Sequence, residues 1–350
     1  MTYITVSIIL IFALLGLVYL YYEFIAVPST MPDSSKNNEI LTVGIVKKIA
    51  PSSILNTKPK FMDPIPEINY PYVVKYTTVL DDINLAYVDE GRGKHTILFV
   101  HGLGSYLKGW IKNIDELKKY YRCIALDLPG YGKSSRGNYS YDMSFHSRVV
   151  RSFIEKKNLK HVILVGHSMG GQVSMTTVLN SSERINKLIL VAPAGIETFS
   201  EAEKILVNNF YHPSLLKAAT ESQIKRNFKL NFFNFPEDAN FMIEDRFLLK
   251  ETKWYDTYCE MIPKCVLGML NQPVFNKIDK IDIPTLIIYG ENDMLIPNKL
   301  LHPNLSTTKV GKMANNKIPN SSLKMVRRCG HFAQWNQAEE VNELMKEFVG

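Results

Sequence analysis

Val165-Gly166-His167-Ser168-Met169-Gly170-Gly171 follows an apolar run and opens a helical pattern, which predicts a sharp turn from a strand into a helix at Ser168. In a Gly-x-Ser-x-Gly turn of this kind the serine backbone is strained and its Oγ is exposed. The flanking glycines are needed because the turn leaves no room for a Cβ. The helix N-terminus behind the turn also favours negative charge. We therefore predict that Ser168 is a nucleophile, with an inert glycine-rich turn as the alternative.

Short apolar runs recur on both sides of this turn. They span Lys75–Leu80, Ile83–Asp89, Thr96–Val100, Cys123–Leu126, Val162–Val165, Leu188–Val191, Thr285–Tyr289 and Leu323–Val326. The first two alternate and are separated by Asp81-Asp82, which predicts an antiparallel pair. The others are rich in Val, Ile and Leu, as in a parallel sheet buried on both faces.

Helical patterns such as Ser144–Lys157 and Ala338–Phe348 separate these runs. The alternation predicts an α/β protein with a doubly wound sheet. About 90 residues lie between Val191 and Thr285, far more than a crossover needs. We therefore predict an insertion there, roughly Glu197 to Phe275, that is mainly helical.

A serine hydroxyl is a poor nucleophile until a base takes its proton. Of the eight histidines, His331 is the best placed, because it follows the last predicted strand and precedes the final helix. His101 and His167 adjoin the backbone of the site, and we expect both to be structural. The remaining five are expected at the surface or as helix caps: His95, His146, His161, His212 and His302.

The base needs an acid that orients it and stabilises its charged form. Gly290-Glu291-Asn292-Asp293, after the penultimate strand, offers two carboxylates. An acid directly after Gly290 stays within the turn, whereas one three residues on can point back to His331. We predict Asp293 as the acid and retain Glu291 as the alternative.

The oxyanion that forms when a serine attacks a carbonyl needs preorganised N–H donors. His101-Gly102-Leu103-Gly104 follows the run Thr96–Val100, at the carboxyl edge of the sheet where ligands bind. We predict the backbone N–H groups of Leu103 and Met169 as the donor pair. A simple turn without this role is the alternative.

From about Lys75 to Gly350 the chain resembles the α/β-hydrolase superfamily. The motifs that carry the resemblance are His101-Gly102-Leu103-Gly104, Asp127-Leu128-Pro129-Gly130-Tyr131-Gly132-Lys133-Ser134, the Ser168 turn, Gly290-x-x-Asp293 and Gly330-His331. The chain order Ser168, Asp293, His331 is also the family's order. The resemblance implies that Asp127 is structural. Dehalogenases and epoxide hydrolases of the family carry Asp as nucleophile, so Ser168 argues against those two activities.

The resemblance further implies an α/β-hydrolase fold: a mostly parallel, eight-stranded sheet with a helical cap inserted after the sixth strand. The long insertion falls at that place. We therefore expect residues 73–196 and 276–350 to form the core and residues 197–275 to form the cap.

The N-terminus is predicted to be a separate element. Ile4–Tyr22 contains no charged residue, and about 20 apolar residues in a helix span a bilayer. No Lys or Arg precedes this run, and no small-residue cleavage site follows it, which argues against a signal peptide. We predict a transmembrane anchor in residues 1–27 and a stalk or wrapping segment in residues 28–72. The alternatives are a cleaved signal, leaving a secreted or periplasmic protein, and a buried helix.

Composition excludes several other classes of protein. The chain has 350 residues, 46% apolar and 21% charged, which excludes a mainly disordered or collagen-like chain. Its net charge of +7 comes from scattered Lys and Arg, so we expect no nucleic-acid partner. The cysteines form no C-x-x-C motif; Cys123 and Cys329 are expected in buried strands, while Cys259 and Cys265 could pair. No phosphate loop, dinucleotide fingerprint or metal cluster stands out, so we expect no cofactor and no metal.

These features together predict a serine hydrolase that cleaves carboxylic esters through an acyl-enzyme. The insertion is rich in aromatic residues, some of which we expect to line an apolar pocket. With a membrane anchor beside it, an apolar or lipid-like ester is the expected substrate. C–C bond hydrolases and perhydrolases share the same triad and remain alternatives, as does a binding protein of the same fold without catalysis.

Overall fold

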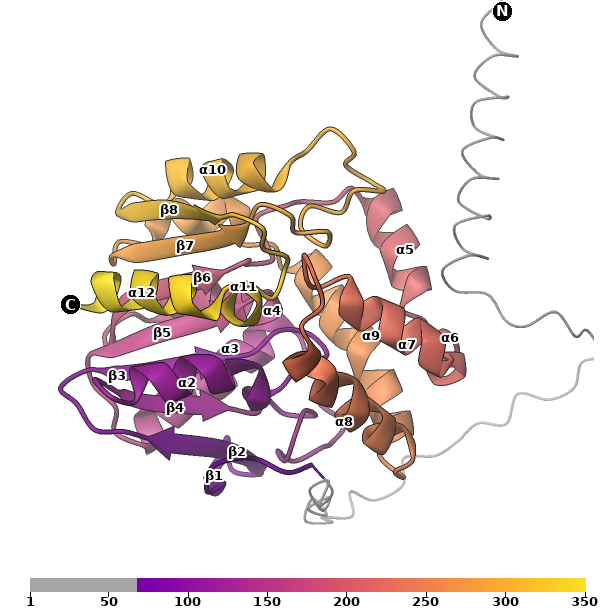
Figure 1. Ribbon diagram of the computed structural model, residues 1–350, viewed down its shortest axis with the longest axis horizontal. Helices are drawn as coiled ribbons and strands as arrows, with labels where there is room; N and C mark the ends of the chain where they lie inside the picture. The colour runs from indigo at the N-terminus through magenta and orange to yellow at the C-terminus, as the bar shows by residue number, and fades with distance from the viewer. Residues whose placement is uncertain (1–67) are drawn as a thin grey trace, which may run out of the picture. The chain divides into compact units, whose positions relative to one another are not determined.

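The computed structural model describes residues 68–350, and its strands form one eight-stranded sheet (Figure 1). The strands are β1 (Lys75–Val79), β2 (Ile83–Glu90), β3 (Thr96–Val100), β4 (Arg122–Leu126), β5 (Val162–His167), β6 (Ile185–Val191), β7 (Thr285–Gly290) and β8 (Ser321–Val326). Their order is β1-β2-β4-β3-β5-β6-β7-β8, with β2 antiparallel to both neighbours and all other pairs parallel. The predicted α/β-hydrolase fold and its mostly parallel sheet are confirmed.

The predicted hairpin also forms. β1 and β2 pair from Lys75 opposite Tyr87 to Val79 opposite Ile83. Leu80 and Asp81 take positive φ values in the turn between them. The two strands lie at one edge of the sheet, where β2 pairs with β4.

Helices outside the insertion cover the two faces of the sheet. They are α2 (Ile111–Leu117), α3 (Met143–Lys156), α4 (Met169–Asn180), α10 (Thr307–Lys317), α11 (Ala333–Asn336) and α12 (Ala338–Val349), with short 3-10 turns η1 (Leu107–Trp110) and η3 (Phe275–Lys280). The predicted helices Ser144–Lys157 and Ala338–Phe348 correspond to α3 and α12.

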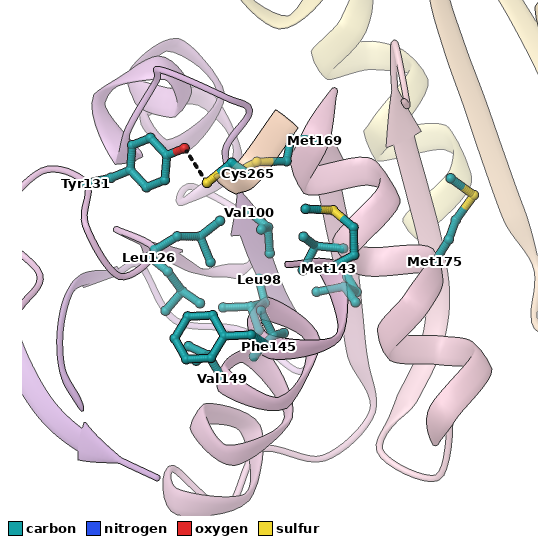
Figure 2. Packing of buried hydrophobic residues seen from close by; sticks show 14 of the residues in the cluster. Leu98, Val100, Leu126, Tyr131, Met143, Phe145, Val149, Met169, Met175 and Cys265 are labelled. Atoms are coloured by element: carbon teal, nitrogen blue, oxygen red, sulfur yellow. Dashed lines mark hydrogen bonds between the residues drawn. The ribbon is translucent and has the colours of Figure 1, made fainter. Parts of the chain in front are cut away.

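Successive residues of the central strands point to opposite faces, as a strand period of two requires. Leu98 and Val100 of β3 join a core cluster with Val149 of α3, and Figure 2 shows this packing. Ile97 and Phe99 of the same strand pack in a second cluster that includes Trp110. A strand buried on both faces therefore lies at the middle of the protein, and its carboxyl end is held rigidly.

Five helices lie in the chain between β6 and β7, and we call them the inserted helices. They are α5 (Glu201–Phe210), α6 (Pro213–Ala218), α7 (Glu221–Lys229), α8 (Asn240–Lys250) and α9 (Tyr255–Asn271), with the 3-10 turn η2 (Glu237–Ala239) before α8. A third apolar cluster joins Phe232 and Met242 of this segment to Phe332 and Trp335. The inserted helices thus pack against the loop that follows β8.

The four cysteines are buried and free. Cys259 and Cys265 therefore do not pair. Cys123 lies in β4 as predicted, but the prediction for Cys329 was wrong: this residue lies in the loop after β8, which ends at Val326. Cys329 is buried, as predicted. Burial alone, however, does not distinguish a strand from a packed loop.

The predicted anchor Ile4–Tyr22 lies outside the described residues, as does most of the predicted stalk. Within residues 68–350, no helix has both the length and the apolar character that crossing a bilayer demands.

Candidate active site

Ser168 lies at the turn between β5 and α4, where its backbone is strained. Its φ is +52° and its ψ is −118°, a conformation that costs roughly 1–3 kcal/mol for a residue with a Cβ. The turn is held by hydrogen bonds from Ser168 N to Val191 O (3.0 Å) and from Ala194 N to Ser168 O (3.0 Å). The side chain is half-buried at the N-terminus of α4.

The glycines beside Ser168 are required by close backbone contacts. A Cβ on Gly166 would lie 2.3 Å from the carbonyl oxygen of Gly170. A Cβ on Gly170 would lie 2.4 Å from the carbonyl oxygens of His101 and Val100. Since no side chain fits at either position, the helix α4 can approach the end of β3 closely.

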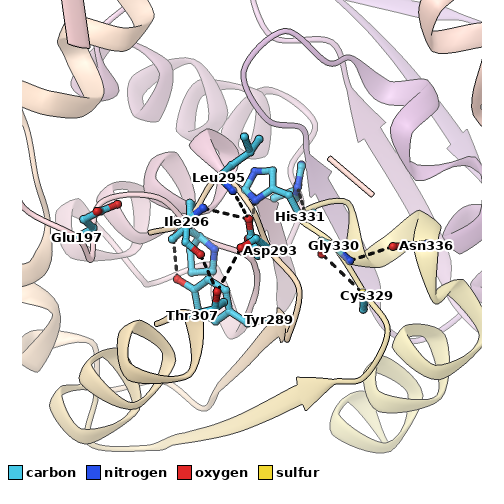
Figure 3. Close-up of polar contacts among 12 residues, drawn as sticks. Glu197, Tyr289, Asp293, Leu295, Ile296, Thr307, Cys329, Gly330, His331 and Asn336 are labelled. Carbon is cyan, nitrogen blue, oxygen red and sulfur yellow. Dashed lines mark hydrogen bonds and ion pairs between the residues drawn. The ribbon is translucent and has the colours of Figure 1, made fainter. Parts of the chain in front are cut away.

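His331 and Asp293 form a buried pair in loops that follow β8 and β7 (Figure 3). The distance from His331 Nδ1 to Asp293 Oδ2 is 2.8 Å. The other carboxylate oxygen, Oδ1, accepts hydrogen bonds from the N–H groups of Leu295 (2.8 Å) and Ile296 (3.0 Å). Both oxygens of Asp293 are thus occupied, and the imidazole is held with Nε2 available for a proton. Glu291 is exposed to solvent.

His167 connects Ser168 to the loop that carries His331. Burial, reinforced by the nearby His331, holds the pKa of His167 well below its usual range. The neutral ring donates from Nε2 to the carbonyl oxygen of His331 at 3.0 Å, and the two rings lie 4.9 Å apart. His167 therefore has the structural role expected of it, and it places the backbone of His331 beside the Ser168 turn.

Leu103, one predicted oxyanion donor, belongs to the loop after β3. Its neighbour Gly102 packs directly against the turn, since a Cβ on Gly102 would lie 3.0 Å from the Cβ of Ser168. Met169, the other predicted donor, is the first residue of α4, where backbone N–H groups have no partner within the helix. β3 and β5 are neighbours in the sheet, but the chain continues from β3 to β4 on one side and from β5 to β6 on the other. The loops after β3 and β5 therefore diverge, and ligands of open α/β sheets bind at such a switch point.

His101 and Asp127 stabilise the neighbouring loops. His101 is neutral, because burial lowers its pKa to about 4, and its Nε2 accepts from Leu128 N at 3.0 Å. Asp127 accepts hydrogen bonds from Leu107 N, Lys133 N and the hydroxyl of Tyr70. Both residues join the loops that follow β3 and β4.

The surface or capping role expected for His146 was wrong. The side chain is fully buried in α3, and its Nε2 lies 3.8 Å from the Sγ of Cys265 in α9. His302 also differs from expectation, because it pairs with Glu197 and lies 3.3 Å from Glu203. His212 does cap α6. In both cases the ring contacts a distant segment, and local sequence carries no signal of that contact; His146 is buried by it, whereas His302 stays partly exposed.

A small, partly open cavity lies beside the loop after β3. Gly104, Tyr106 and Tyr131 line it from the core, and Tyr258 of α9 lines it from the inserted helices. Three charged residues also line it: Arg136, Asp245 and Arg246. These charged residues belong to no sequence motif, so no local pattern predicts them at the site. Within the described part of the chain, no group of three or more His, Cys, Asp or Glu residues is arranged to hold a metal ion.

Residues 95–338 match the family model described as the alpha/beta hydrolase fold, which covers more than half of the chain. The chain belongs to the α/β-hydrolase fold family.

Curated relatives of known activity agree with this membership. The chain is 29% identical to a 2-hydroxy-6-oxononadienedioate/2-hydroxy-6-oxononatrienedioate hydrolase of Paraburkholderia phymatum, over 79% of this chain and 95% of the relative. It is 30% identical to the hydrolase of the same name from Escherichia coli O81, over 76% of this chain and 91% of the relative. Family and relatives support hydrolase as the class of enzyme.

A solved structure shows the same fold. A probable hydrolytic enzyme of Pseudomonas aeruginosa PAO1 superimposes with a TM-score of 0.73 at 23% identity, over 84% of this chain and 99% of that chain.

Proposed function

We propose that this protein is a serine hydrolase that cleaves carboxylic esters with Ser168 as nucleophile, His331 as base and Asp293 as the acid that orients it. The observation that carries the proposal is the buried 2.8 Å pair of His331 and Asp293 beside a strained serine at a strand-to-helix turn. Backbone strain of this kind is found at functional sites, where the surrounding structure maintains it. The strain is consistent with a hydroxyl that must be presented to a substrate.

The proposed reaction proceeds in two halves. His331 takes the proton of Ser168 as Oγ attacks the ester carbonyl, and the N–H groups of Leu103 and Met169 stabilise the oxyanion. The alcohol leaves with the proton from His331, so an acyl-enzyme remains. Water, deprotonated by the same histidine, then releases the acid.

Apolar side chains at the cavity support an apolar acyl or alcohol group in the substrate. Met242 and Leu249 of α8 and Tyr258 of α9 offer apolar surface there. Each buried CH₂ contributes about 0.8 kcal/mol of binding free energy. We therefore expect medium-chain esters to be better substrates than acetates.

Hydrolysis of a C–C bond next to a ketone is the second candidate. The relatives at 29% and 30% identity carry that kind of substrate in their names, a dioate with two carboxylates. The positive charges of Arg136 and Arg246 at the cavity favour such an anionic substrate, while their guanidinium N–H groups already donate to backbone carbonyl oxygens. The same serine, histidine and aspartate would serve this reaction.

Two measurements test the proposal. A fluorophosphonate probe should label the wild-type protein and not Ser168→Ala, because only an activated serine reacts. Steady-state kinetics should then compare p-nitrophenyl esters of two to eight carbons with a 2-hydroxy-6-oxo-dienoate. A higher kcat/KM for the dienoate would favour C–C hydrolysis, and absence of labelling would leave a binding protein of this fold.

We further propose that Ile4–Tyr22 anchors the enzyme in a membrane. The uncharged length of this stretch supports the proposal. An anchored enzyme would meet lipid-like esters at the bilayer surface.

A further inference from the structure

The loop that carries Leu103 is held by two neighbouring residues of α8. Arg246 Nη2 donates to the carbonyl oxygen of Gly104 at 2.6 Å. Asp245 accepts from Lys108 Nζ at 2.6 Å and from the hydroxyl of Tyr106. We call these three hydrogen bonds the α8 contact. It ties an inserted helix to both ends of the segment from Gly104 to Lys108.

The α8 contact is buried at the pair of Lys108 and Asp245 and half-buried at Arg246. The side chains of Lys108 and Asp245 are 10% and 9% exposed. The Lys108 ammonium also lies 4.6 Å from the ring centre of Phe241, and the Arg246 guanidinium lies 4.5 Å from that of Tyr258. Packing on all sides thus leaves these charged groups little freedom to move.

Burial of such a pair is a poor way to stabilise a fold. Removing both charges from water largely cancels their attraction, and apolar residues of similar size often stabilise a protein as well or better. The pair therefore calls for a role in geometry. Its position supplies one, because Lys108 ends the segment that begins next to Leu103.

We infer that Asp245 is a positioning residue, which acts through Lys108 and Tyr106 to hold the Leu103 N–H where the oxyanion forms. The inference rests on the proposed function. Gly104 has a φ of +68°, a conformation that glycine adopts without strain, so its own backbone does not restrict the loop. The α8 contact restricts the loop from outside. On this inference, the Leu103 N–H reaches its place in the oxyanion site only when the inserted helices pack against the loop.

A pair of ester substrates separates positioning from general structural support. A donor N–H stabilises the oxygen anion of an ester strongly, but the sulfur anion of the matching thionoester only weakly, since sulfur is a poor acceptor. Displacement of the donor should slow the ester and spare the thionoester. Loss of structure should slow both alike.

Asp245→Asn should lower kcat for the ester by about 10- to 100-fold, with KM within about threefold, because removing a whole oxyanion donor lowers kcat by about 10²–10³. The thionoester rate should change by less than about threefold. The double variant Lys108→Met/Asp245→Leu removes both buried charges and should regain the wild-type Tm while its ester kcat stays low.

Asp238→Asn is the matched control. Asp238 also joins the inserted segment to the core, through Lys112 at 2.7 Å and Trp335 at 2.9 Å, but it makes no contact with residues 104–108 among its hydrogen bonds and ion pairs. Its ester-to-thionoester ratio should match the wild type.

Three results would overturn the inference: wild-type kcat in Asp245→Asn, recovery of ester kcat along with Tm in the double variant, or equal slowing of ester and thionoester. Failure of the proposed function is seen separately, as absence of fluorophosphonate labelling in the wild-type protein.

Discussion

Three of the buried histidines, His101, His146 and His167, are uncharged in the folded protein. Burial lowers the pKa of His101 to about 4 and that of His146 to about 3, and it holds the pKa of His167 well below the usual range. In the unfolded chain each would titrate near 6.5. Because the folded pKa values are depressed, the contribution of these residues to stability is present above pH 6.5 and is lost as the pH falls through the folded values.

His146 offers a clean test of this linkage, because it is remote from the hydrogen bonds of His331. We expect the free energy of unfolding of the wild type to fall between pH 6 and pH 4. In His146→Leu the slope should be shallower by up to about 1.4 kcal/mol per pH unit, which corresponds to one proton fewer. Urea denaturation at several pH values measures it. An unaltered slope in His146→Leu would contradict a neutral, buried ring at this position.

Substitution of each of the two acids after β7, Asp293 and Glu291, distinguishes their roles. Asp293→Asn keeps the shape of the side chain but favours the wrong tautomer of His331, so we expect kcat to fall by roughly 10⁴-fold. Glu291→Gln removes an exposed charge that solvent screens, and kcat should change by less than about tenfold. Ester kinetics on both variants decide between them. The reverse ranking would make Glu291 the triad acid.

Helix α3 shows how one element is positioned for packing on the sheet. Its N-cap is Asp142, whose side chain accepts a hydrogen bond from Phe145 N at 2.7 Å. Gly268 of α9 packs on the same residue, since a Cβ there would lie 2.7 Å from Asp142 Cα. The start of α3 is therefore fixed both by its own cap and by an inserted helix.

Loss of this cap should be measurable. Asp142→Ala should lower the free energy of unfolding by about 1 kcal/mol, the usual value for an N-cap. Asp142→Ser restores an oxygen acceptor and should recover most of the loss. Denaturant midpoints of the three proteins give the comparison. Equal destabilisation by Ala and Ser would mean that packing against α9, and not the hydrogen bond, is what matters.

At the scale of the whole molecule, the sheet brings together loops from four distant strands. Leu103 follows β3, Ser168 follows β5, Asp293 follows β7 and His331 follows β8. Parallel strands end at the same edge of a sheet, so their carboxyl ends converge without any further device. The loop after α7 also reaches that edge, through the hydrogen bond from Phe332 N to Asn231 O at 2.9 Å.

The proposed anchor is tested on the full chain. If Ile4–Tyr22 spans a bilayer, the protein should sediment with membranes and resist carbonate washing, because about 20 apolar residues insert stably. A chain that starts at Lys36 should stay in the supernatant and keep its activity, since β1 begins only at Lys75. Release of the full chain by carbonate, or a mature N-terminus after Ala26, would contradict the anchor.

Local patterns in the sequence determined the strands and helices of this protein and the loops that carry the candidate site residues. Strand and helix periods, the glycines around Ser168 and the position of His331 after the last strand are properties of short segments, so they can be read without a structure. The burial of His146 and the α8 contact could not be read in this way. Lys108 and Asp245 lie 137 residues apart, and no spacing or motif links them. Only the packing of α8 against the loop after β3 brings them together, because a contact between distant segments depends on how whole elements dock.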